Sequence, residues 1–91
     1  MRDDDILRIL EDAAKRLEIK VDYDDLIKGE VNTEGGLFSL RGEKRILIHK
    51  GLDVKERIDV LLKLLSGMDT EGIHLPPVVR RRLEEAKESA A

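Results

Sequence analysis

The fold of this 91-residue chain is decided by one stretch, residues 35–69, which reads GGLFSLRGEKRILIHKGLDVKERIDVLLKLLSGMD. Two short apolar segments, Leu37–Arg41 and Arg45–His49, flank a turn centred on Gly42 and Glu43. Apolar segments separated by so short a turn are typical of an antiparallel hairpin. We therefore predict two adjacent strands here, followed directly by a helix.

Alternation within the hairpin assigns its side chains to two faces, because successive residues of a strand point to opposite sides. We expect Phe38 and Leu40 to face the core on the first strand, and Ile46 and Ile48 to do so on the second. Leu47 is expected on the opposite face.

The helix after the hairpin starts at Asp53, whose side chain can cap it, with Glu56 three residues later as in a capping box. Its apolar residues cover most of its circumference, which is typical of a helix buried on more than one side. These residues are Val54, Ile58, Val60, Leu61, Leu62, Leu64, Leu65 and Met68. Because Met68 still fits the helical period, we expect the helix to end between Asp69 and Gly72.

The rest of the chain supplies the elements that pack around this unit. Periodic apolar residues after Asp3–Asp5 predict an N-terminal helix, and alternation in Ile19–Tyr23 predicts a third strand. Residues 26–28 are expected to form a short helical turn or an irregular anchor, and Gly29–Gly36 a surface loop. A last helix is expected to start at Pro77, where proline suits the first turn.

These elements predict a single α+β domain over residues 1–91, with residues 88–91 frayed. The order is helix, strand, strand, strand, helix, helix. We expect a small three-stranded, largely antiparallel sheet with about three helices packed on one of its faces. Apolar and charged residues each make up 41% of the chain, a mixture that fits a folded protein with a densely charged surface.

The composition argues against several classes of protein. The chain has no Cys, so it holds neither disulfides nor thiolate metal sites. Its net charge of −3 argues against a general nucleic-acid binder. No apolar run reaches the roughly 18–20 residues of a membrane span, and the first residues lack the layout of a signal peptide. We therefore expect a cytoplasmic protein that does not associate with membranes.

Residues that could carry chemistry are few. His49 and His74 would form a catalytic or metal site only if the fold brought them together with an acid; the alternative is two surface histidines. The acidic runs at Asp3–Asp5 and Asp22–Asp25 fit a charged helix start and a strand end, because the other ligands of a calcium loop are missing. Nucleophile-elbow and phosphate-loop motifs are absent from the sequence. We predict a non-catalytic protein without metal or cofactor.

The broad apolar surface of the central helix favours an interaction role. A short chain has few elements with which to cover so many aliphatic residues, so some of them are available for a protein partner or for a second copy in a homodimer. The alternative is complete burial inside the monomer. The predicted contact residues are Leu37, Leu47, Val60, Leu64 and Met68.

A second hypothesis is nucleic-acid or phosphate binding through basic residues of the hairpin and the last helix. The residues that would carry it are Arg41, Lys44, Arg45, Lys50 and Arg80. Neighbouring acids offset both clusters, and aromatic residues that could stack on bases are absent from them. A solvated charged surface is the simpler interpretation.

The stretch from the hairpin to the central helix resembles the core of the ImmA/IrrE-type zinc metallopeptidases, in which a strand leads into a helix carrying E-R-x-x-x-x-L-A-H-E-L-G-H. Matching positions are Ile46–His49 for the strand, Glu56–Arg57, Leu62 and Gly67. The zinc-ligand positions hold Leu64 and Met68, and the position of the catalytic Glu holds Leu65. Aliphatic side chains neither bind zinc nor accept protons, so the resemblance implies a scaffold without the family's chemistry.

The chain also resembles a group of small bacterial proteins that share a GGL…RG…I-x-I segment and an EG-x-x-x-PP-x-V-R tail. The tail is found here at Glu71–Gly72 and Pro76–Arg80. This second resemblance implies a bacterial origin but no activity.

Overall fold

The structure of the protein is a computed structural model that describes residues 1–25 and 35–90. It contains three helices and three strands in the order α1 (Asp3–Arg16), β1 (Ile19–Asp24), β2 (Gly35–Leu40), β3 (Glu43–His49), α2 (Val54–Leu65) and α3 (Pro77–Ala90). The predicted α+β class and element order are confirmed. The turn expected at residues 26–28 and the loop expected at 29–34 lie outside the described residues.

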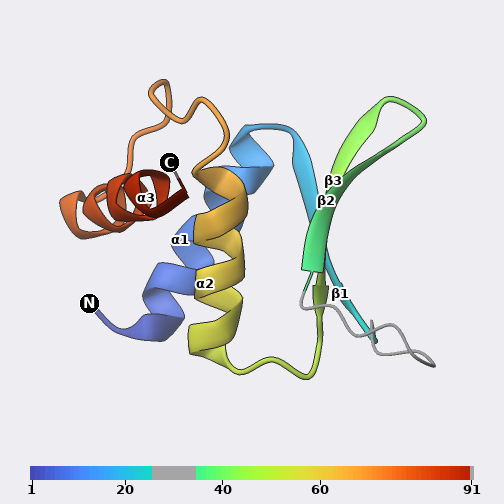
Figure 1. The fold of residues 1–91 in the computed structure, drawn as a ribbon, viewed down its shortest axis with the longest axis horizontal. Coiled ribbons are helices and arrows are strands. Elements are labelled where there is room, and N and C mark those ends of the chain that lie inside the picture. The colour runs from blue at the N-terminus through green and yellow to red at the C-terminus, as the bar shows by residue number, and fades with distance from the viewer. Residues whose placement is uncertain (26–34, 91) are drawn as a thin grey trace.

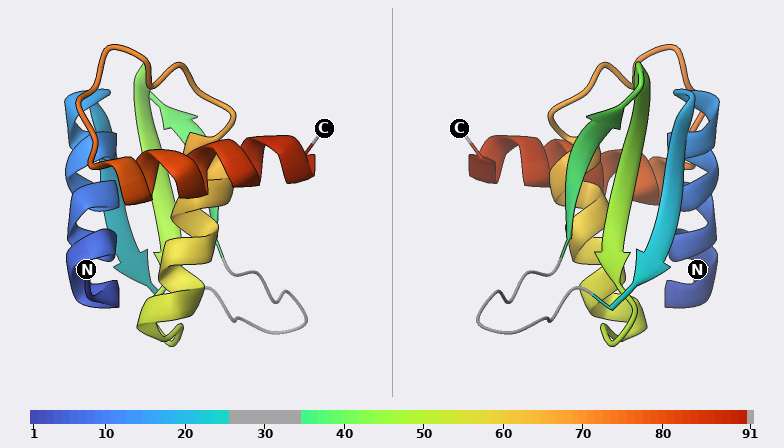
Figure 2. Two further views of the ribbon diagram at one scale, coloured as in Figure 1. Left: turned by 90° about the vertical axis from the view of Figure 1, so that its left-hand side faces the viewer. Right: turned by 90° about the vertical axis from the view of Figure 1, so that its right-hand side faces the viewer.

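The strands form one mixed sheet in the order β1-β3-β2. β3 is central, parallel to β1 and antiparallel to β2. Figure 1 shows the sheet as one layer, with α1 and α2 side by side on one of its faces. α3 packs on α1 and α2 and forms a third layer, away from the strands. The right-hand view of Figure 2 looks onto the other face of the sheet, which no described helix covers.

The core lies between the sheet and the layer of α1 and α2. Ile46 and Ile48 of β3 are fully buried against these helices, as the alternation predicted. The other large side chains that are fully buried are Leu10, Ile58, Leu61, Leu65 and Val79. Val79 belongs to α3, so that helix closes the far side of the helical layer.

The central helix α2 begins as predicted and ends earlier than predicted. Asp53 Oδ1 accepts a hydrogen bond from the Glu56 N–H (2.9 Å), and the Glu56 carboxylate accepts one from the Asp53 N–H (3.1 Å). The helix ends at Leu65, before the predicted end at residues 69–72. The N–H groups of Gly67 and Met68 bond to carbonyl groups three residues back, so the chain tightens out of the α-helix.

The turn of the hairpin differs from the prediction by one residue. Its two residues are Arg41 (φ 52°) and Gly42 (φ 82°), which follow Leu40 and precede Glu43. Two successive residues with positive φ make a type I′ turn, which matches the twist of the flanking strands. Gly42 takes this conformation without steric cost, because it has no Cβ.

The faces of β2 also differ from the prediction. Phe38 pairs with Arg45 and Leu37 with Ile46, so Leu37 shares the helix-facing side with the buried Ile46. Phe38 and Leu40 therefore lie on the outer face, which no described helix covers, and their predicted core positions are wrong. Residues 35 and 36, predicted as part of a loop, belong to β2. α3 extends to Ala90, past the start of its predicted frayed end at residue 88.

Candidate interaction surface

Strand β2 concentrates the exposed apolar side chains of the described residues. Among the described residues, five large hydrophobic side chains are exposed: Met1, Leu37, Phe38, Leu40 and Val78. Three of the five lie within the six residues of β2, with exposed fractions of 43% for Leu37, 42% for Phe38 and 47% for Leu40. The same strand, GGLFSL, contains no charged residue. β2 is therefore an apolar and uncharged strand at the border of the molecule.

The free edge of β2 presents backbone hydrogen-bonding groups. Arg41 and Gly42 make a two-residue turn, so Leu40 and Glu43 are its first and last residues and form a hydrogen-bonded pair. Hydrogen-bonded pairs alternate along an antiparallel ladder, so Leu40, Phe38 and Gly36 direct their backbone groups towards β3. Their neighbours Gly35, Leu37 and Ser39 direct theirs outward.

A backbone hydrogen bond on the other side of β3 supports this assignment. The Lys50 N–H donates to the Asp24 carbonyl at the end of β1 (2.8 Å). The backbone N–H and C=O groups of even-numbered residues of β3 therefore point towards β1, and those of odd-numbered residues point towards β2. Among the described residues, no strand pairs with the outer edge of β2. The right-hand view of Figure 2 shows β2, in green, at the border of the sheet.

The other edge strand differs from β2 in its charge. β1 carries Lys20, Asp22 and Asp24 on the outer face of the sheet, opposite residues of β3 in the parallel register. Charged residues on an edge strand oppose pairing with another chain. The sheet therefore has one edge protected by charge and one edge without that protection.

A shallow groove of about 160 Å³ lies where β2 meets α2. It is lined by Gly35, Asp59, Val60, Lys63 and Leu64. Gly35 is required at this point, because a Cβ here would lie 2.6 Å from the Leu47 carbonyl oxygen and 3.3 Å from Val60 Cγ1. The groove continues the apolar surface of β2 onto the helix.

The five predicted contact residues lie on different elements and differ in their exposure. Leu37 is exposed on β2, and Leu64 is half-buried beside the groove. Val60 lines the groove but is only 7% exposed, so it offers little area to a partner. Leu47 is half-buried on the outer face of β3, and Met68 is half-buried in the segment after α2. The sequence reasoning missed Phe38 and Leu40 as surface residues, because it assigned them to the core.

The basic residues do not gather into one patch. Arg41 lies in the hairpin turn before β3, whereas Lys50 follows its far end. Arg45 pairs with Glu43 (2.9 Å). Arg80 donates hydrogen bonds to Thr70 Oγ1 (2.9 Å) and to the carbonyl groups of Thr70 (3.1 Å) and Ile73 (2.6 Å).

Arg80 is therefore occupied in holding the segment between α2 and α3. Lys44 is exposed at the start of β3, where it pairs with Ser39 of β2. Arg41, Lys44 and Arg45 lie close together in the hairpin, but the side chains of Lys44 and Arg45 point to opposite faces of the sheet. Lys50 follows the far end of β3 and Arg80 belongs to α3, so the five residues do not form a single basic surface.

The two histidines lie at opposite ends of the molecule. His49 ends β3, and His74 lies in the segment that joins α2 to α3. Figure 1 shows this segment and the end of β3 on opposite sides of the helical layer. His49 Nδ1 is 3.8 Å from a carboxylate oxygen of Asp25. Within residues 1–25 and 35–90, no group of three or more His, Asp or Glu side chains is placed to hold a metal ion.

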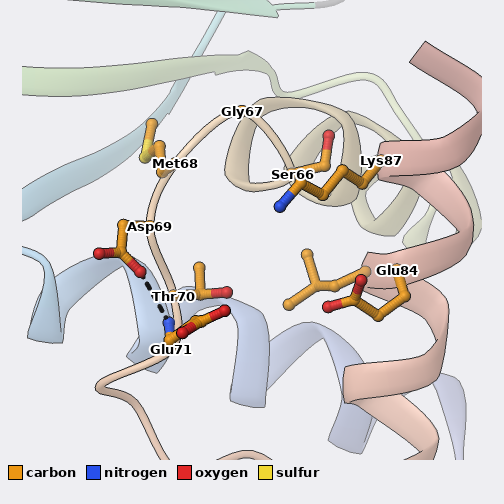
Figure 3. Close-up of a pocket in the computed structure, with 9 residues that line it drawn as sticks. Ser66, Gly67, Met68, Asp69, Thr70, Glu71, Glu84 and Lys87 are labelled. Atoms are coloured by element: carbon orange, nitrogen blue, oxygen red, sulfur yellow. Dashed lines mark hydrogen bonds between the residues drawn. The ribbon is translucent and has the colours of Figure 1, made fainter. Parts of the chain in front are cut away.

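A cleft of about 470 Å³ lies between the segment after α2 and the helix α3. Its lining residues are Ser66, Gly67, Met68, Asp69, Thr70, Glu71, Leu83, Glu84 and Lys87. Figure 3 shows Glu84 and Lys87 of α3 across the opening from Asp69 and Glu71. Asp69 Oδ1 accepts a hydrogen bond from the Glu71 N–H (3.1 Å) and so serves the local turn. The cleft is polar, and both of its hydroxyl groups take part in local hydrogen bonds. Ser66 Oγ donates to the Lys63 carbonyl (2.8 Å), and Thr70 Oγ1 accepts from Arg80 (2.9 Å).

Tyr23 of β1 connects this strand to the helices α1 and α2. Its hydroxyl donates to Glu11 Oε2 (2.5 Å), and the Arg57 guanidinium lies 4.6 Å from the centre of its ring. Burial, and then the hydrogen bond to Glu11, raise the pKa of the phenol well above its usual value. Arg57 also donates to the carbonyl groups of Leu52 and Lys50. The protonated phenol and the guanidinium thus connect α1, β1 and α2 through hydrogen bonds and a cation–π contact.

Comparison with known proteins gives no relative: no family model, no curated protein and no solved structure matches the chain. The resemblance to zinc metallopeptidases stays a prediction. At its ligand positions Leu64 and Met68 are half-buried, and Leu65, at the position of the catalytic Glu, is fully buried. No helix among the described residues is both long enough and apolar enough to cross a membrane.

Proposed function

We propose that the protein is a non-catalytic interaction module that binds a strand of a partner protein along the free edge of β2. The observation that carries the proposal is the coincidence of three properties in one strand. β2 lies at the edge of the sheet, lacks charge, and exposes Leu37, Phe38 and Leu40.

The mechanism is strand addition. An extended segment of the partner would bond to the outward backbone groups of Gly35, Leu37 and Ser39, which give affinity without regard to sequence. Side chains of β2 would give specificity, because Leu37 faces the helical side and Phe38 and Leu40 the outer side. Leu64, beside the groove on α2, would extend the contact on the helical side.

A non-catalytic role also fits the residues that the sequence resemblance singles out. The positions at which metallopeptidases of that family carry ligands and a base hold Leu64, Met68 and Leu65 here. We propose that the scaffold serves contact between surfaces and that no bond is made or broken on it.

The proposal is tested by a pair of substitutions at Ser39, which is exposed and has its N–H on the free edge. Ser39→Pro removes that N–H and blocks an added strand, while the bonds of Phe38 and Leu40 to β3 remain. Ser39→Ala keeps the N–H and serves as the matched control. Tagged wild type and both variants are used to capture proteins from an extract of the native cell.

We expect wild type and Ser39→Ala to capture the same proteins, and Ser39→Pro to lose them. Thermal unfolding of each variant establishes that it is folded at the temperature of the capture. If folded Ser39→Pro retains every protein that the wild type captures, the binding surface lies elsewhere and the proposal is wrong.

A further inference from the structure

We infer that the strand added to β2 is β2 of a second copy of this chain, placed antiparallel about a two-fold axis that passes between the two Leu37 residues. This inference rests on the proposed function and adds the identity and register of the partner. It is drawn from the backbone pattern, the side-chain pattern and the charge of β2.

The backbone pattern is self-complementary. Gly35, Leu37 and Ser39 all direct their N–H and C=O groups to the free edge. With Leu37 opposite Leu37 of the second copy, Gly35 lies opposite Ser39, and Ser39 opposite Gly35. Each of these is a hydrogen-bonded pair of an antiparallel ladder, so every outward group of β2 finds an acceptor or a donor. The result is one continuous six-stranded sheet with the helices of both copies on the same side.

The side chains fit the same register. On the outer face, Phe38 lies opposite Gly36 of the second copy, where no side chain competes for the space. An aromatic ring that covers a glycine across two strands shields the glycine backbone from water. On the helical side, the two Leu37 side chains meet at the axis. A register centred on Phe38 would leave Gly35 opposite Arg41, which belongs to the turn and not to the strand.

The charge pattern favours a second copy. In an antiparallel pair about a two-fold axis, the residue at the axis lies opposite its own copy, so a charge at that position would repel itself. β2 has no charge to repel, whereas β1, the other edge, carries Lys20, Asp22 and Asp24. The sequence thus permits self-pairing at one edge of the sheet and opposes it at the other.

The exposed area sets the strength of the contact. The three exposed side chains of β2 present on the order of 250 Å² per copy. This is well below the ~800 Å² per partner of a standard stable interface, even after the backbone of six residues is added. We therefore expect a reversible dimer with a dissociation constant on the order of 10–100 μM.

Sedimentation equilibrium of the purified full chain, up to about 500 μM, tests the dimer. We expect wild type and Ser39→Ala to dimerise alike, and Ser39→Pro to raise the dissociation constant at least about 10-fold. Leu37→Lys places like charges at the axis and should have the same effect, so it serves where the proline variant does not fold. Val78→Asp removes an exposed apolar residue from α3 and is the control, with an unchanged dissociation constant expected.

Three results would overturn the inference: a wild type that stays monomeric, a Leu37→Lys variant that dimerises like the wild type, and a series of ever larger species in place of a closed dimer. A monomeric wild type would leave the proposed function standing if Ser39→Pro still lost captured proteins of other sequence. Loss of both effects would remove the proposed function as well.

Disulfide trapping tests the register, because the chain has no native cysteine. Leu37→Cys places its two thiols across a hydrogen-bonded pair, with Cα atoms about 5.5 Å apart, which a disulfide can span. Ser39→Cys places them four residues apart along the strand, at roughly 13 Å, which a disulfide cannot span. We expect rapid oxidation to a covalent dimer for Leu37→Cys only. Trapping of Ser39→Cys at an equal rate would contradict the register.

Discussion

Two adjacent glycines at the start of β2 should respond to alanine in opposite ways. A Cβ on Gly35 would lie 2.6 Å from the Leu47 carbonyl oxygen and 3.2 Å from Ile48 Cα, and both are backbone atoms of the central strand. An ordinary carbon–oxygen contact is about 3.3 Å or more, so the strands must separate by roughly 0.7 Å. Overpacking costs about 1–3 kcal/mol, and the upper part of this range applies, because backbone cannot rotate away.

We therefore expect Gly35→Ala to lower the free energy of unfolding by about 2–3 kcal/mol and the melting temperature by roughly 10–20 °C. Gly36 has no atom within 4 Å of its Cβ position and no positive φ, so Gly36→Ala should be neutral or stabilise by about 0.5 kcal/mol through the unfolded chain. Urea unfolding followed by circular dichroism, at a protein concentration below the dissociation constant, measures both. Equal stabilities of the two variants would refute the close approach of β2 to β3 and α2.

Three further substitutions test the internal ties. Tyr23→Phe should cost about 1–2 kcal/mol at pH 7. The pKa of Tyr23 is raised in the folded state, so the contribution of this phenol to the free energy of unfolding is complete below about pH 10 and is lost as the pH rises further. The loss of stability at alkaline pH should therefore be smaller in Tyr23→Phe than in the wild type. Urea unfolding at a series of pH values measures this difference. Arg80→Ala should cost about 2 kcal/mol and speed amide exchange in residues 66–76, while the exposed neighbour Arg81→Ala should do neither. Asp53→Ala should cost about 1 kcal/mol in thermal unfolding, through loss of the cap of α2.

The class of the fold and the start of α2 could be predicted from the sequence, because both depend on local signals. The capping pair Asp53 and Glu56 and the apolar period of the helix act over a few residues. The end of α2 could not be predicted, since Met68 continues the period. Backbone bonds from Gly67 and Met68 to carbonyls three residues back end the helix at Leu65, and no side-chain pattern announces them.

The faces of β2 could not be predicted, because three of its last four residues are apolar. Leu37, Phe38 and Leu40 leave only Ser39 to indicate a face, and alternation from this one polar residue favours the wrong assignment, with Phe38 and Leu40 in the core. The turn decides between the two assignments. The turn begins at Arg41, which adopts φ 52°, an uncommon value for a residue with a side chain. The prediction from sequence therefore located the turn one residue too late. The exposed surface of β2 was missed for this reason.

The role of Arg80 shows a second limit of sequence reasoning. As one of three consecutive arginines, Arg80 suggests a basic surface, but its guanidinium donates hydrogen bonds to Thr70 and Ile73. Those partners are carbonyl and hydroxyl groups of an irregular segment seven and ten residues earlier. Only the path of that segment brings them together, and no spacing in the sequence encodes it.

The position of α3 explains why an apolar strand is left uncovered. The helices α1 and α2 fill one face of the sheet, so among the described helices only α3 could have covered the outer face or the free edge of β2. Val79 and Leu83 instead bury α3 against the helical layer. Among residues 1–25 and 35–90, no helix or strand therefore covers Phe38 and Leu40, and the second copy that we propose would contact them. The packing of α3 on the helical layer is thus the feature of the fold that leaves β2 accessible for the contact that we propose.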